Sequence, residues 1–146
     1  MEKFIIREFK ECDRAYICRT VLFCLIENDK HSTRINKDSF LSGHNVILNQ
    51  VLDRAKCLVV ADPEENKLIY GFIIYEQSLG NFDVVHFAYV RSQFRGIGLL
   101  KNLREVIQTK KFLAVTHLTD SIRPAKLKAY YEKVIFDPYL IIGVKQ

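Results

Sequence analysis

Three apolar segments in the middle of the chain restrict its fold more than any other feature. They are residues 57–61, 68–76 and 83–90, each of strand length and rich in Val, Ile, Phe and Tyr. A turn-forming stretch at residues 62–66 separates the first two, and a Gly-Asn pair at residues 80–81 separates the second from the third. Strands joined by such short connections pair antiparallel, so the sequence predicts an antiparallel meander.

The flanking segments add helices on both sides of this meander and further strands after it. Apolar residues at helical spacing predict helices, and short apolar runs predict strands. The predicted helices are residues 13–27, a segment from Asp38 or Ser39 to about Arg54, residues 99–107, and a segment opened by Pro124 that runs through Lys133; the predicted strands are residues 4–9, 112–118 and 139–144. The resulting order, β-α-α-β-β-β-α-β-α-β, predicts an α/β fold whose sheet is antiparallel in its N-terminal half and flanked by helices.

Composition restricts the class of protein. The 146 residues, of which 49% are hydrophobic and 27% charged, suit a single domain spanning residues 1–146. No apolar run approaches the roughly 20 residues that a bilayer crossing needs, and the N-terminus lacks a secretory signal pattern, so we expect a cytoplasmic protein without membrane partners. The net charge of +5 favours anionic partners, but the basic residues are spread along the chain and make nucleic acid an unlikely partner.

The cysteines give no sign of a metal centre. None of Cys12, Cys18, Cys24 and Cys57 has the C-x-x-C spacing of a zinc site or redox pair. We expect reduced, mostly buried thiols and no metal.

The loop from Arg91 to Gly98 is where the sequence points to chemistry. It joins a strand to a helix, and the first amides of a helix lack partners and carry partial positive charge. Gly96 and Gly98 allow the backbone to approach a ligand closely, and Arg95 and Lys101 add charge. This combination indicates a phosphate-binding site, although a plain turn explains two glycines almost as well.

The segment resembles motif A of the GNAT superfamily of acyl-CoA-dependent N-acetyltransferases, in which an Arg/Gln-x-x-Gly-x-Gly/Ala pattern follows a strand. Two registers fit, from Gln93 to Gly98 and from Arg95 to Leu100; the second is preferred because it keeps the family's usual step from Val90 to the arginine. Downstream, Tyr-Glu-Lys-Val-Ile-Phe at residues 131–136 is similar to the family's Tyr-Glu-Lys-x-Gly-Phe.

The resemblance implies a GNAT-like mixed sheet in which parallel strands four and five splay apart. It also implies that acetyl-CoA is the acyl donor, with its pantetheine in the gap and its pyrophosphate on the loop. The residues that the resemblance assigns to this donor are Ala88, Tyr89, Val90, Phe94, Arg95, Gly96, Ile97, Gly98, Leu99, Leu100 and Lys101.

The resemblance assigns the acid that protonates the departing thiolate to Tyr131, and a slip of one residue would exchange it with Tyr130. The attacking amine also needs a base. The candidates are Glu76, Asp83, His117 and the preferred His86, since a histidine titrates near neutral pH. Alternation along the strand predicts His86 and Ala88 on one face of the sheet.

The predicted function is therefore transfer of an acetyl group from acetyl-CoA to a primary amine of a small molecule or protein, by direct attack on the thioester. The alternative is a non-catalytic module of the same fold that binds acyl-CoA or a protein partner, which the departures from the family pattern at Leu100, Pro124 and Ile135 favour. A homodimer is compatible with either hypothesis.

Overall fold

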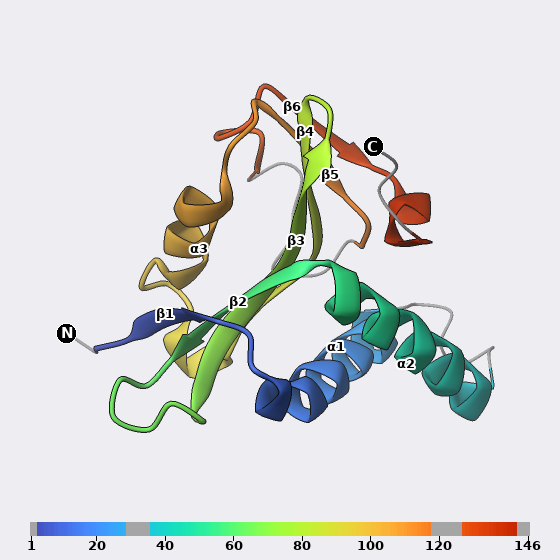
Figure 1. Cartoon of the computed structure of the whole chain (residues 1–146), viewed down its shortest axis with the longest axis vertical. Helices are drawn as coiled ribbons and strands as arrows, with labels where there is room; N and C mark the ends of the chain where they lie inside the picture. The colour runs from blue at the N-terminus through green and yellow to red at the C-terminus, as the bar shows by residue number, and fades with distance from the viewer. Residues whose placement is uncertain (1–2, 29–35, 118–126, 143–146) are drawn as a thin grey trace.

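A computed structural model describes residues 3–28, 36–117 and 127–142 of the chain. They contain one six-stranded sheet in which the strands lie side by side in the order of the sequence (Figure 1). The strands are β1 (Ile5–Glu8), β2 (Lys56–Ala61), β3 (Ile69–Leu79), β4 (Phe82–Val90), β5 (Phe112–Val115) and β6 (Lys133–Phe136). The helices are η1 (Glu11–Asp13), α1 (Arg14–Asn28), α2 (Lys37–Arg54), η3 (Ser92–Phe94), α3 (Leu99–Ile107) and η4 (Pro138–Ile142).

The sheet separates two apolar cores. α1 and α2 pack on one face, where Ile17, Leu48 and Val51 are fully buried against β2, β3 and β4. α3 packs on the other face through Leu99 and Leu103 (Figure 1). The meander between the two layers is almost entirely buried, which explains why its strands read as continuous apolar runs.

The pairing confirms the predicted mixed sheet. β1 to β4 are antiparallel, whereas β4 pairs parallel with β5 over residues 82–85 and 112–115, and β5 pairs parallel with β6. The last backbone link between β4 and β5 is the Thr116 N–H, which donates to the Val85 carbonyl at 3.2 Å. β4 continues to Val90, and within the described ranges its pairing with β5 ends at Val85.

A β-bulge interrupts β4 at His86. Tyr75 pairs with Val85 and Ile74 pairs with Phe87, so His86 is the extra residue. Val85 and Ala88 therefore both belong to the α3-side core, while the His86 ring bonds to Glu76, whose other oxygen faces Arg54 of α2. The prediction that His86 and Ala88 share a face is wrong, because the bulge breaks the two-residue period.

The C-terminal elements also differ from the prediction. The predicted helix from Pro124 lies largely outside the described residues, and its expected end at Lys133 is wrong because Lys133 begins β6. The predicted strand at residues 139–144 is also wrong over its described part, where Pro138 begins a 3-10 helix instead. Proline has no N–H for a strand ladder, and its fixed φ suits a first helical turn.

In the part of the chain described above, no helix is both long and apolar enough to span a membrane. None of the four cysteines forms a disulfide with another described residue, and burial raises the pKa of Cys57 to about 12.

Candidate functional site

The loop after β4 is fixed at both ends. The Arg91 N–H donates to the Tyr70 carbonyl at 2.8 Å, and the Phe94 ring stacks on the Tyr70 ring with 4.0 Å between centroids. Gly96 and Gly98 then adopt φ values of +85° and +88°. A side chain at either position would meet open space, so the left-handed backbone conformation is what requires glycine.

These conformations leave a row of amides unbonded. The first helical hydrogen bond of α3 runs from the Asn102 N–H to the Gly98 carbonyl at 2.9 Å. Among the described residues, nothing accepts a hydrogen bond from the amides of residues 96–101. They lie at the N-terminus of α3, where the helix dipole adds positive potential, so the loop can bind an anion.

The side chains of the loop separate into anchors and exposed groups. Leu99 is buried in the α3-side core, whereas Lys101 and Ile97 are exposed. The Arg95 Nε donates to the Val90 carbonyl at 2.8 Å, and its guanidinium carbon lies 6.0 Å from the centre of the Tyr89 ring. The Arg95 Nη groups therefore remain available for a ligand.

Tyr131 lies in the α3-side core beside β4. Its side chain is only 4% exposed, and its hydroxyl has no partner in hydrogen-bonding geometry among the described residues. It borders a small cavity of about 30 Å³, together with Ala88 and Leu100. Burial, followed by the charge of the nearby Asp83, raises the pKa of Tyr131 well above its ordinary value, so the phenol stays protonated.

The neighbouring candidates have other surroundings. Tyr130 is 45% exposed, and the Arg104 guanidinium lies over its ring at 3.5 Å. Asp83 is buried, and it accepts hydrogen bonds from the Thr109 N–H, the Thr109 hydroxyl and the Lys110 N–H. Asp83 thus caps the loop before β5.

His86 is the centre of a buried polar network. Its ring is fully buried, with Nε2 at 2.6 Å from a Glu76 carboxylate oxygen and Nδ1 at 3.1 Å from the Thr116 hydroxyl. The same hydroxyl lies 2.9 Å from Nδ1 of His117, and the other Glu76 oxygen lies 3.4 Å from Arg54. One threonine hydroxyl therefore links two histidines.

The charges in this network follow from its surroundings. Burial opposes ionisation of Glu76, but the hydrogen bond and charge of His86 together with Arg54 outweigh it, so the Glu76 pKa is lowered. Burial, with the charges of His44 and His86, lowers the pKa of His117 to about 4. Glu76 is then a carboxylate and His117 a neutral ring at pH 7. Because a carboxylate only accepts hydrogen bonds, the Nε2 of His86 carries the hydrogen.

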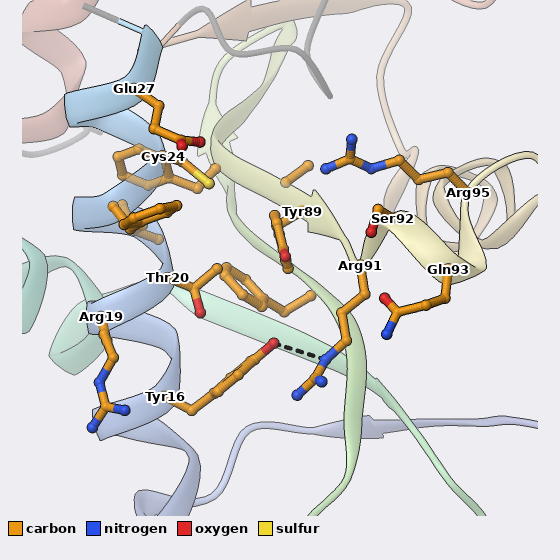
Figure 2. A pocket seen from close by; sticks show the side chains of 15 residues that line it. Tyr16, Arg19, Thr20, Cys24, Glu27, Tyr89, Arg91, Ser92, Gln93 and Arg95 are labelled. Carbon is orange, nitrogen blue, oxygen red and sulfur yellow. Dashed lines mark hydrogen bonds between the residues drawn. The ribbon is translucent and has the colours of Figure 1, made fainter.

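A second, larger cavity of about 530 Å³ opens between α1, β4 and the loop (Figure 2). The residues that line it from α1 include Tyr16, Thr20, Cys24 and Glu27, at spacings of three or four, so they form one helix face. This face was not predicted from the sequence, because the apolar periodicity of the helix indicates only the opposite, buried face. The signal available was a polar and aromatic stripe beside the buried residues.

Comparisons with solved structures decide the fold family. The chain aligns with a protein from Pyrococcus furiosus, provisionally described as an acetyl transferase, at a TM-score of 0.63, with 13% identity over 87% of this chain and 90% of that chain. It aligns with a possible acetyltransferase from Clostridium difficile 630 at a TM-score of 0.57, with 18% identity over 88% of each chain. The chain has the GNAT fold.

A third similar structure was solved with acetyl-CoA. It is a predicted acetyltransferase from Clostridium acetobutylicum, with a TM-score of 0.51 and 14% identity over 88% of this chain and 90% of that chain. No family model and no curated protein matches the sequence.

Proposed function

We propose that the chain is an N-acetyltransferase that moves the acetyl group of acetyl-CoA to a primary amine. The observation that carries this proposal is the combination of unbonded amides at residues 96–101 with the buried, unpartnered hydroxyl of Tyr131. A buried hydroxyl without a partner costs about 1–3 kcal/mol, so its retention suits a group kept for a ligand. The GNAT fold supports the same conclusion.

The donor would bind along the end of β4. The loop amides, with Arg95 and Lys101, would hold the diphosphate by charge-assisted hydrogen bonds. No described residue of β5 pairs with β4 beyond Val85, so backbone groups of β4 there can bond to the amides of the pantetheine chain. The diphosphate contact uses amides that the described residues leave unbonded.

In the reaction, the amine nitrogen attacks the thioester carbonyl carbon. A C–N bond forms and the C–S bond breaks. The departing sulfur takes its proton from the Tyr131 hydroxyl, which is protonated at pH 7. Holding donor and acceptor side by side at β4 would supply the positioning that the reaction needs.

The attacking amine must also lose a proton, which a group of the protein has to accept. We assign its receipt to Nε2 of His117, whose ring stacks on the cavity-lining Phe87 at 4.2 Å. The His117 Nδ1 hydrogen then passes to the Thr116 hydroxyl, whose own hydrogen passes to Nδ1 of His86. The charge ends on His86 opposite the Glu76 carboxylate, where it is compensated.

Titration calorimetry with acetyl-CoA tests the donor site. We expect binding by the wild type, and Arg95→Glu should weaken it about tenfold or more because it places a negative charge beside the diphosphate. Lys67→Glu is the matched control, since this exposed lysine of the β2–β3 turn lies outside both cavities. Absence of wild-type binding at millimolar donor, or equal losses in the two variants, would contradict the proposal.

A non-catalytic donor-binding module is the second candidate. The narrowness of the cavity beside Tyr131, about 30 Å³ with Leu100 in its wall, favours it. A thiol-release assay over a panel of amines separates the two functions, because only an enzyme releases CoA faster with an acceptor present.

A further inference from the structure

The larger cavity carries positive charge that the described residues do not balance. Its charged lining residues are Arg19, Arg91, Arg95 and Glu27. None of the three arginines forms an ion pair with any described residue. A concave site with excess positive charge attracts an anionic group.

The Arg91 side chain is held in place by Tyr16, and its Nη groups are left to bind a ligand. Its Nε donates to the Tyr16 hydroxyl at 3.0 Å, and its guanidinium carbon lies 5.1 Å from the centre of the Tyr16 ring (Figure 2). Its Nη groups have no acceptor within the described ranges. A guanidinium fixed in this way loses little freedom on binding, and its planar fork matches a carboxylate.

The charges that remain for the acceptor sum to +1. Arg95 is assigned to the donor under the proposed function, which leaves Arg19 and Arg91 as two positive charges and Glu27 as one negative charge. The ligand that balances them carries a single negative charge. The other walls are aromatic, formed by Tyr16, Phe23, Phe72, Phe87 and Tyr89. Such walls suit an acceptor with an apolar or aromatic body.

We propose that the acceptor is a primary amine that also carries a carboxylate, and that Arg91 binds this carboxylate with support from Arg19. This inference rests on the proposed function for the role of the amine. Ala88 borders both cavities, so an amine held from Arg91 along β4 meets the donor's side of the sheet there.

Three amines that differ only at one substituent test the proposal: L-phenylalanine, L-phenylalaninamide and phenethylamine. We expect kcat/KM, corrected for the unprotonated fraction of each amine, to be at least about 10-fold higher for L-phenylalanine. Arg91→Gln should remove this preference, whereas Lys67→Gln, which loses the same charge outside the cavity, should keep it. Equal rates for the three amines, or an unchanged preference in Arg91→Gln, would overturn the inference.

Two further arms separate the possible failures. A preference for O-phosphoethanolamine over β-alanine would identify the anion as a phosphate and overturn the carboxylate assignment. Calorimetric titration of L-phenylalanine and its amide does not depend on turnover. If acetyl-CoA does not bind, the proposed function fails, and the two titrations still decide whether the cavity selects a carboxylate.

Discussion

At the scale of single residues, the environment decides between chemically identical side chains. Tyr130 and Tyr131 are neighbours in sequence, yet one lies exposed against Arg104 and the other is buried beside Ala88. A motif alone could not choose between them, because a one-residue slip exchanges them. In the structure, burial distinguishes the two: the Tyr130 side chain contacts solvent, whereas the Tyr131 side chain lines the small cavity.

Tyr131→Phe should lower kcat by about 100-fold or more, because the thiolate then leaves without a positioned acid. The KM for acetyl-CoA should change little. The free energy of unfolding should stay constant or increase, since the substitution removes a buried hydroxyl without a partner.

Steady-state thiol release and urea denaturation measure these effects, with Tyr130→Phe as the exposed control. A Tyr131→Phe enzyme with wild-type kcat would show that the acid is another group.

At the scale of elements, the bulge and the network around it join β4 to β5 where their pairing ends. The Thr116 hydroxyl lies 3.4 Å from the His86 carbonyl and also links the two histidine rings. This network closes the space between the strands below the point where they part. A sequence pattern of period two cannot reveal such a bulge, because the extra residue has no distinctive chemistry.

Thr116→Val removes this link at almost constant volume. It leaves Nδ1 of the buried His86 without a partner, so we expect a loss of about 1–3 kcal/mol in the free energy of unfolding. Thr20→Val is the control, since no hydrogen bond of its hydroxyl is found among the described residues.

The relay adds a kinetic expectation for the same variant. Without the hydroxyl, charge on His117 cannot pass to His86, so the pH–rate profile should change shape as well as height. A purely structural threonine would lower stability and leave the profile of kcat against pH unchanged.

At the scale of the whole molecule, the sequence predicted the architecture better than the site. The apolar meander indicated the antiparallel half of the sheet with its flanking helices, and the resemblance implied the parallel β4–β5 pair, whereas donor binding by the glycine loop stays a prediction. The last strand was not predicted because residues 133–136 form a very short apolar run. Residues 139–144 look more strand-like, and only the preceding Pro138 argues against a strand there. The larger cavity was not predicted because it depends on how α1 faces β4, which only tertiary packing sets.

The stability of the fold should depend on pH through the partly buried His117. The folded pKa of His117, about 4, lies below its ordinary value of 6.5, so the unfolded chain binds the proton first as the pH falls. Stability is complete above pH 6.5 and should decrease by about 2–3 kcal/mol on going down to pH 4. His44 faces His117, and burial also lowers the pKa of His44. Its protonation therefore lowers stability at acid pH in the same direction.

Urea denaturation at several pH values measures this slope. His117→Asn should flatten it between pH 6.5 and 4, and parallel slopes for the two proteins would contradict the assignment.

Ala88 lines both cavities, one on each side of the sheet. One methyl group borders the compartment under α3 and the compartment under α1 alike. Any larger side chain at this position would take room from both compartments at the same time. A single position of β4 therefore couples the space on the two sides of the sheet.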